Sequence, residues 1–208
     1  MSRRQVDGSG LRTSTNSGRV AVAVLLAAAC GPSPSAAAPG SNVVAKNVSA
    51  APGVVVTAGC TPTGPELCFN ASDDNCNGVI DEGCGASTGV LQFMIAWGDS
   101  PADVDLIVAD PSGARITKSN RTTPSGLQLE KNCPDDGCHQ QNVENVYFDG
   151  VEPARGRYVV EVKLVDPRGA ELPVKVHLSA RVGSRTWAMD LTLSPGQGQD
   201  RQGFSFDL

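Results

Sequence analysis

Strict alternation of apolar and polar side chains over several short segments most limits how this chain can fold. A period of two residues places one kind of side chain on each face of a β-strand. Val174, Val176 and Leu178, for example, alternate with Lys175 and His177. The segments with this pattern are residues 91–97, 158–164, 174–182, 187–193 and 204–208.

Turn-forming sequences lie between these segments, at residues 110–113, 166–169, 182–185 and 194–196. No stretch of the sequence has the period of a helix. One apolar and one polar face is the pattern of antiparallel sheets that cover a core. The chain is therefore expected to be all-β, and residues 86–208 are expected to form an antiparallel β-sandwich of about eight strands.

The first 29 residues have the order of features of an export signal. Four arginines precede an apolar run at residues 20–29, which is shorter than the roughly 20 residues that span a bilayer but suits the core of a signal peptide. Residues 26–30, Leu-Ala-Ala-Ala-Cys, resemble the lipobox of bacterial lipoproteins, with Leu26 one place further from the cysteine than is usual. In that family the cysteine, here Cys30, receives diacylglycerol and begins the mature protein. A plain cleaved signal with an incidental cysteine is the alternative.

This resemblance implies a lipid-anchored protein of the cell envelope. An aspartate after the cysteine retains enteric lipoproteins at the inner membrane, and Gly31 stands there instead, so the outer membrane is expected. The chain has 17 basic and 22 acidic side chains, of which 13 and 21 remain without residues 1–29. Such an acidic protein matches the phosphate backbone of nucleic acid poorly. The expected partners are the membrane and a surface protein or glycan, and not nucleic acid.

The seven cysteines are an odd number. With Cys30 modified by lipid, an even set of six remains, as disulfides in an oxidising compartment require. Cys133 and Cys138 are expected to pair, and a zinc site that includes His139 is the alternative. The other four allow three pairings, and they are Cys60, Cys68, Cys76 and Cys84.

Two segments precede the expected sandwich. Residues 30–59 are rich in Pro, Ala, Ser, Gly and Val and have almost no charge, so they are expected to form a flexible tether. Residues 60–85 form a compact cysteine-rich segment.

The cysteine-rich segment has oxygen-bearing side chains at the spacing of a calcium loop. Counted from Asp73, they fall at positions 1, 3, 5 and 9, with Gly78 at position 6. Alternate positions direct oxygens toward a hard cation, and the glycine permits the sharp turn. Cys84 stands at position 12, where such loops have a bidentate glutamate, and Glu82 or water can fill that place. The predicted ligands are Asp73, Asn75, Asn77, the Val79 carbonyl and Asp81.

Residues 66–84 resemble a metal-binding motif that is repeated in myxobacterial surface proteins and is similar to thrombospondin type 3 calcium repeats. The motif family takes its name from a copper-binding protein, but copper prefers His, Met or thiolate, and this loop has no His or Met. Calcium is therefore the expected cofactor, and an acidic turn that binds no ion tightly is the alternative. The resemblance rests on Glu66-x-Cys68, Asp73-Asp-Asn-Cys76-Asn-Gly78 and Ile80-Asp-Glu-Gly-Cys84.

Most of residues 90–165 resemble a bacterial domain of unknown function that occurs in secreted and surface proteins and looks related to pre-peptidase C-terminal β-sandwiches. This resemblance implies a fold and an exported setting, and no established activity. Gln128 stands where the family often has a further glycine. The residues that carry it are Asp103-Val-Asp105-Leu, Asp110-Pro-Ser-Gly113, Ser125-Gly126-Leu, Glu144-Asn-Val-Tyr147 and Gly156-Arg-Tyr158.

Asp103 and Asp105 lie two residues apart on one expected strand, so their carboxylates are expected on one face, roughly 7 Å apart. Like charges at that distance need a cation or hydrogen-bond donors, and Glu144 can complete such a cluster. These three residues, the acidic corner, form a possible second site. The alternative is that they cap turns.

The sequence favours a cell-envelope lipoprotein with a calcium-stabilised spacer and a β-sandwich module for binding or adhesion. One alternative is a structural envelope lipoprotein without a specific ligand. Another is a surface hydrolase that uses the acidic corner. Because the sequence has no Gly-x-Ser-x-Gly motif and no phosphate-binding glycine loop, no enzyme activity is expected.

Overall fold

The computed structural model describes residues 42–60, 62–138 and 141–208. These residues belong to one compact unit, Ala37–Leu208. The expected signal peptide, Cys30 and His139 lie outside the described residues. The described part of the chain contains strands and turns but no helix, which confirms the expected all-β class.

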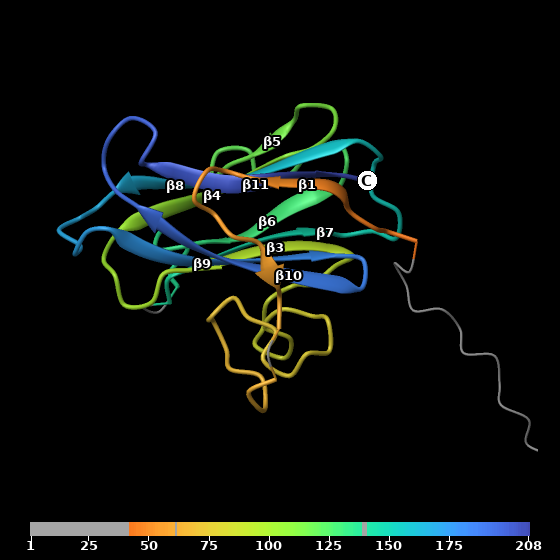
Figure 1. Ribbon diagram of the computed structural model, residues 1–208, viewed down its shortest axis with the longest axis horizontal. Coiled ribbons are helices and arrows are strands. Elements are labelled where there is room, and N and C mark those ends of the chain that lie inside the picture. Colours follow the sequence, from red (N-terminus) through yellow and green to blue (C-terminus); the bar gives the residue numbers. More distant parts are fainter. Residues whose placement is uncertain (1–41, 61, 139–140) are drawn as a thin grey trace, which may run out of the picture. The chain divides into compact units, whose positions relative to one another are not determined.

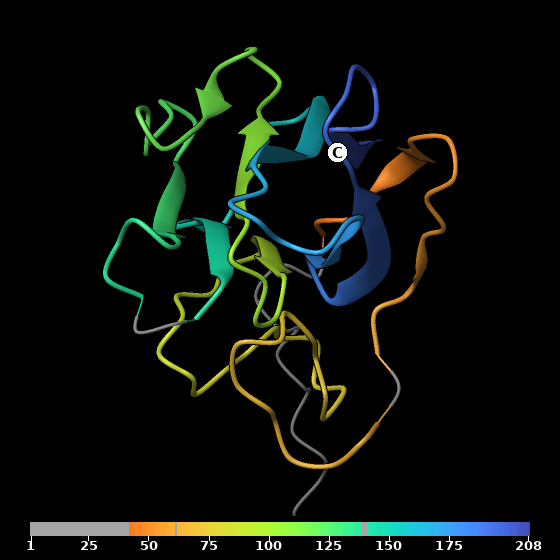
Figure 2. The same cartoon turned by 90° about the vertical axis from the view of Figure 1, so that its left-hand side faces the viewer.

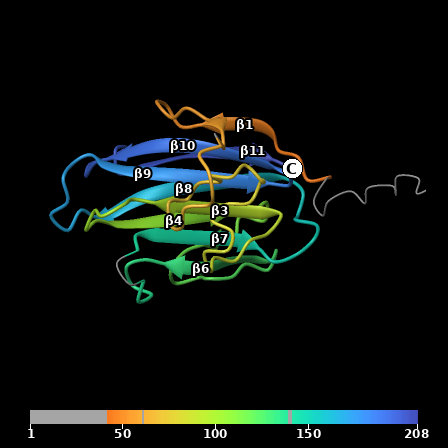
Figure 3. The same ribbon diagram turned by 90° about the horizontal axis from the view of Figure 1, so that it is seen from below.

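Two sheets face each other (Figure 1), and every strand pairing among the described residues is antiparallel. Sheet A contains, in spatial order, β1 (Lys46–Ala50), β11 (Arg201–Asp207), β8 (Arg157–Asp166), β4 (Asp103–Ala109) and β5 (Arg115–Ile116). Sheet B contains, in spatial order, β2 (Thr57–Ala58), β10 (Arg185–Leu193), β9 (Val174–Val182), β3 (Leu91–Ala96), β7 (Val143–Phe148) and β6 (Leu127–Asn132), and Figure 3 shows the order from β10 to β6. Residues 86–208 contribute β3 to β11, of which β5 has only 2 residues, so the sandwich of about eight strands is confirmed.

Aromatic side chains connect the two sheets, which are separate layers when the strands are viewed from the end (Figure 2). The ring of Phe93 on β3 lies 6.4 Å from that of Phe204 and 6.0 Å from that of Phe206, both on β11. Tyr158 on β8 stacks on Phe206 at 5.2 Å. Such ring pairs stabilise a core beyond the burial of their area, so β3, β8 and β11 define its centre.

The cysteine-rich segment covers the outer face of sheet B. Gln92 and Met94 alternate away from the core side of β3, yet all six residues of β3 are buried. The Gln92 amide donates to the Ile80 carbonyl at 3.2 Å, and Ile80 is 0 % exposed. The segment expected to be a spacer is therefore packed on the sandwich and is part of the same hydrophobic core.

Part of the segment expected to be a flexible tether also belongs to the sandwich. β1 pairs with β11, and β2 pairs with β10. The amide of Ala51 donates to the Gly203 carbonyl at 2.8 Å, and that of Gly59 donates to the Thr186 carbonyl at 2.9 Å. These strands are mostly exposed and are held by backbone hydrogen bonds, which side-chain alternation does not reveal.

The turn that follows β4 is organised by the buried carboxylate of Asp110. It accepts hydrogen bonds from the hydroxyls of Ser112 and Ser125, both at 2.5 Å, and from the amides of Ser112 and Ala114 at 2.9 and 3.1 Å. Burial acts to raise the pKa of Asp110, but these donors outweigh it and lower the pKa below its usual value. The carboxylate therefore stabilises the fold in its charged form.

Asp110→Ala is expected to lower the free energy of unfolding by about 2–3 kcal/mol at neutral pH, because hydrogen bonds to a charged group contribute about 1.5–3 kcal/mol. A depressed folded-state pKa means that this contribution is present above the unfolded pKa and is lost as the pH falls through the folded one. Denaturant unfolding of both proteins at several pH values is the measurement. Asp99→Ala, at an exposed residue, is the control, and a difference that stays constant down to about pH 2 would contradict the assignment.

Candidate metal-binding sites

The six cysteines other than Cys30 are all paired in the structure. Cys60 is bonded to Cys76 and Cys68 to Cys84, each pair separated by 16 residues, and Cys133 is bonded to Cys138. The six disulfide cysteines were predicted, whereas the pairing within residues 60–84 comes from the structure. Because Cys133 and Cys138 are joined, their sulfurs are not thiolates for the alternative zinc site.

Loss of the Cys68–Cys84 disulfide by joint replacement with serine is expected to lower the free energy of unfolding by about 3 kcal/mol, since the bond closes a loop of 16 residues. The Cys133–Cys138 bond spans 5 residues, and its removal is expected to cost about 2 kcal/mol. Denaturant unfolding without reductant compares the two variants. Peptide mapping of the oxidised protein provides the control, and a Cys60–Cys68 linked peptide would contradict the pairing.

Asp73 closes the turn of the predicted calcium loop. Its two oxygens accept the amides of Asn77 and Gly78, at 3.0 and 2.9 Å. The side-chain oxygens of Asn75 and Asn77 accept the amides two residues further on, at 3.0 and 2.9 Å. Gly78 has a φ of 87°, a conformation that glycine adopts readily. The loop thus has the sharp turn at position 6 that the spacing predicts.

The Glu82 carboxylate meets two side-chain amides of this loop. Its Oε1 atom contacts the amide groups of both Asn75 and Asn77. Its Oε2 atom is buried and has no hydrogen-bond partner among the described residues. A carboxylate and two amides thus meet in one place, and each amide oxygen has a second lone pair after it accepts a backbone N–H.

Asp81, a predicted ligand, is engaged elsewhere. Its two oxygens accept the amides of Phe69 and Ala71, both at 3.1 Å. Its own amide donates to Glu66 at 2.9 Å. Burial raises the pKa of Asp81 to about 6, although the amides of Ala71 and Phe69 act to lower it. The structure therefore places Asp73, Asn75, Asn77 and Glu82 around the loop, and it uses Asp81 to hold residues 69–71.

The acidic corner lies where β4 and β7 begin. Glu144 is 0 % exposed, and its Oε2 atom accepts the amide of Leu106 at 2.6 Å. Asp103 is paired through Oδ2 with Arg168 at 2.7 Å. Of the other carboxylate oxygens, Asp103 Oδ1, Asp105 Oδ1 and Glu144 Oε1 are buried without a hydrogen-bond partner among the described residues.

Burial is the main electrostatic influence on this corner. It raises the pKa of Glu144 well above its usual value, the Leu106 amide opposes this, and the charges of Asp105 and Asp103 raise the pKa further. Burial and then the charge of Asp103 also raise the pKa of Asp105. The charges of Asp103 and Asp105 therefore both act on Glu144, and the second site stays a prediction.

Asn132, Glu66 and Arg168 are site residues that the sequence reasoning did not assign. Asn132, at the end of β6, lies opposite Glu144. Glu66 was part of the recognised motif, but its role, which is to accept the amides of Asp74 and Asp81 at 3.1 and 2.9 Å, was not predicted. In the sequence, Arg168 stood out only as part of the turn-forming residues 166–169.

Ser179, His177 and Asp190 are linked in the same order as the catalytic triad of a serine hydrolase. Ser179 Oγ lies 3.5 Å from His177 Nε2, and His177 Nδ1 lies 2.8 Å from Asp190 Oδ1. A nucleophile must reach its substrate, but Ser179 is 1 % exposed. The carboxylates of Asp103 and Glu144 are similarly buried. These positions do not favour hydrolysis.

Comparison of the chain with family models, with curated proteins and with solved structures finds no significant match. The described residues contain no helix of the length and hydrophobicity needed to cross a membrane. They also contain no group of three or more His, Cys, Asp and Glu side chains that could hold a metal ion. The case for a cation therefore rests on amide and carbonyl oxygens together with carboxylates.

Proposed function

We propose that this protein is a cell-envelope lipoprotein whose β-sandwich binds another surface protein or glycan and is stabilised by calcium in the loop of residues 73–82. The observation that carries the proposal is the meeting of Asn75, Asn77 and Glu82 beside Asp73, with one Glu82 oxygen buried and unpartnered. Calcium prefers such neutral and charged oxygens. It would satisfy the Glu82 oxygen that the protein leaves without a donor.

Calcium in this loop would stabilise the sandwich because the loop is attached to sheet B. The hydroxyl of Thr186 on β10 donates to Asp73 at 3.3 Å, and Ile80 packs in the core. The loop is further held by two disulfides. Calcium binding in the loop would therefore raise the free energy of unfolding of the whole folded unit.

The outer face of sheet A supports a binding role. A groove of about 400 Å³ lies over β8 and β11, with Arg157, Glu161 and Arg201 among its lining residues. Val159 in the same groove is 42 % exposed. Charged side chains of both signs around a small apolar floor suit contact with a protein or a glycan better than a purely structural role.

The calcium site predicts a measurable affinity. Titration calorimetry of the oxidised protein is expected to give a dissociation constant on the order of 10⁻⁴ M, as in extracellular modules. At ten times that concentration, calcium should add about 1.4 kcal/mol to the free energy of unfolding. Glu82→Gln, which keeps the shape but removes the charge, should weaken this gain. Glu171→Gln, at an exposed residue, is the matched control, and equal calcium responses of all three proteins would refute the loop site.

Lipid attachment predicts a labelled protein. Cells that express the wild type and are given a radioactive fatty acid should incorporate the label into this protein, because the sequence up to Cys30 resembles a lipobox. Cys30→Ser should abolish the labelling and release the protein from the membrane fraction, since two or more acyl chains anchor a protein stably. Equal labelling of wild type and variant would rule out this anchor.

A further inference from the structure

Two residues that lie opposite each other in sheet B each have a buried oxygen without a hydrogen-bond donor. Among the described residues, Glu144 Oε1 and Asn132 Oδ1 are buried and have no partner. Glu144 is 0 % exposed and Asn132 is 2 % exposed. Buried polar atoms without a partner are rare in folded proteins, because each costs free energy. A carboxylate oxygen and an amide oxygen are both acceptors, so these two can bond each other only through a proton.

Strand pairing places the two side chains on the same face of the sheet. Asn132 on β6 is the direct partner of Glu144 on β7, and the Cβ atoms of such partners lie about 4.5–5.5 Å apart. On its other side, Glu144 pairs with Ile95 of β3, which is 0 % exposed. Glu144 and Asn132 therefore both face the core.

The second oxygen of Glu144 already has a donor. Its Oε2 atom accepts the amide of Leu106 on β4 at 2.6 Å, so only Oε1 lacks a partner. Asp105 lies between the buried residues Val104 and Leu106, and its side chain therefore points to the opposite, outer face of β4. The carboxylates of Glu144 and Asp105 thus do not face each other as two ligands of one ion would.

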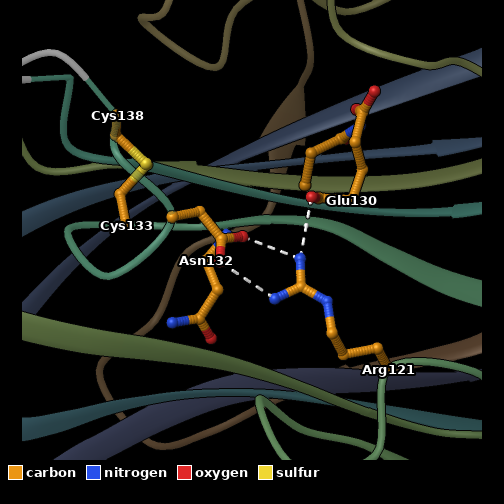
Figure 4. Close-up of polar contacts among 7 residues, drawn as sticks. Arg121, Glu130, Asn132, Cys133 and Cys138 are labelled. Atoms are coloured by element: carbon orange, nitrogen blue, oxygen red, sulfur yellow. Dashed lines mark hydrogen bonds and ion pairs between the residues drawn. A yellow bond between two sulfur atoms is a disulfide. The ribbon is translucent and has the colours of Figure 1, made fainter.

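The arginines near this pair do not supply the missing donor. Arg121 donates to the Glu130 carbonyl at 2.8 Å (Figure 4) and forms an ion pair with Asp136 at 2.7 Å. Arg168 pairs with Asp103 at 2.7 Å. Neither arginine donates to the two unpartnered oxygens.

The strands on either side of Glu144 add no charge to the core face. β3 has no charged residue. On β6, Glu130 accepts the hydroxyl of Ser87 at 2.7 Å, and the Lys131 ammonium lies 4.9 Å from the centre of the Phe69 ring. Both contacts are with residues of the segment before β3, which lies on the outer side of sheet B.

The electrostatic surroundings favour the protonated form of Glu144. Burial raises its pKa well above the usual value, and the charges of Asp105, Asp103 and Asp136 raise the pKa further, against the lowering effect of one backbone amide. Lys163 is the direct partner of Asp105 on β8, and its charge acts to lower the pKa of Asp105.

We propose that Glu144 is protonated in the folded protein at neutral pH and donates its O–H group from Oε1 to Asn132 Oδ1, which makes this contact a pH-sensitive switch in the core. The proton supplies the one donor that both oxygens lack, while the Leu106 amide satisfies Oε2. When the proton leaves at higher pH, a negative charge remains in the core beside an amide oxygen, and an unpaired buried charge is costly. A raised folded-state pKa means that the stabilisation is complete below the unfolded pKa and is lost as the pH rises through the folded one.

Glu144→Gln tests this proposal, because glutamine keeps the shape of the side chain and cannot lose a proton. Its amide oxygen can accept from Leu106, and its NH₂ group can donate to Asn132. Between the unfolded and the folded pKa of Glu144, the folding equilibrium constant of the wild type should fall relative to that of the variant by about tenfold per pH unit, as one proton requires. Denaturant unfolding of both oxidised proteins from about pH 5 to about pH 9 measures this ratio. Glu152→Gln, at an exposed residue, is the matched control and should show no such trend.

Infrared spectroscopy detects the proton itself. The wild type, with glutamate isotope-labelled at the side-chain carboxyl group, should show the carbonyl band of a protonated carboxylic acid at neutral pH and lose it as the pH rises. Glu144→Gln should lack this band, and Asn132→Leu should shift it because the acceptor is removed. If Glu144→Gln does not fold, the pH dependence of the wild-type band decides alone.

Two results would overturn the proposal. The first is a wild type without this band at neutral pH. The second is a stability ratio between wild type and Glu144→Gln that is constant from about pH 5 to about pH 8. A charged Glu144 that accepts a hydrogen bond from a reversed Asn132 amide would produce both results.

Discussion

The contact of Phe93 with Phe204 and Phe206 joins the two sheets, and much of the structure depends on it. The chain has only 5 Phe residues, and three of them are in this contact, so the rest of the core is largely aliphatic. Because β3 is held to sheet A on its inner face, its outer face is a fixed surface. The cysteine-rich segment packs on that surface through Ile80, and this makes the loop a part of the folded unit.

The calcium-like loop and the acidic corner each contain a carboxylate with a buried oxygen that has no hydrogen-bond partner among the described residues. In the loop this is Glu82, and in the acidic corner it is Glu144. The surroundings differ, because the loop is held by disulfides whereas the corner is held by strand pairing. The Glu144 side chain reaches from β7 to the free amide edge of β4. The corner therefore lies where a side chain of sheet B bonds the backbone of sheet A.

The sequence predicted the strands in which apolar residues face the core and polar residues face outward. The prediction failed where an outward face is buried or where the strand register shifts. Alternation identified β9 and β10 because their outward residues are polar. It could not show that Met94 faces outward and is still buried, since the cover comes from a distant segment. Asn132 was missed because a bulge between Leu129 and Lys131 shifts the register, and one extra residue reverses the face of those that follow. The candidate ligands of the loop could be identified from the sequence because they lie close together along the chain.

The two short strands at the start of the described chain occupy positions where the sheets would otherwise end. β1 lies beside β11, and β2 lies beside β10, so residues 46–58 cover one open edge of each sheet. An uncovered edge has free amides and carbonyls that can pair with another chain. Proteolytic removal of everything before residue 60 would take only Val43 from the buried core and yet expose both edges. The segment that leads away from the sandwich therefore also protects it from edge-to-edge aggregation.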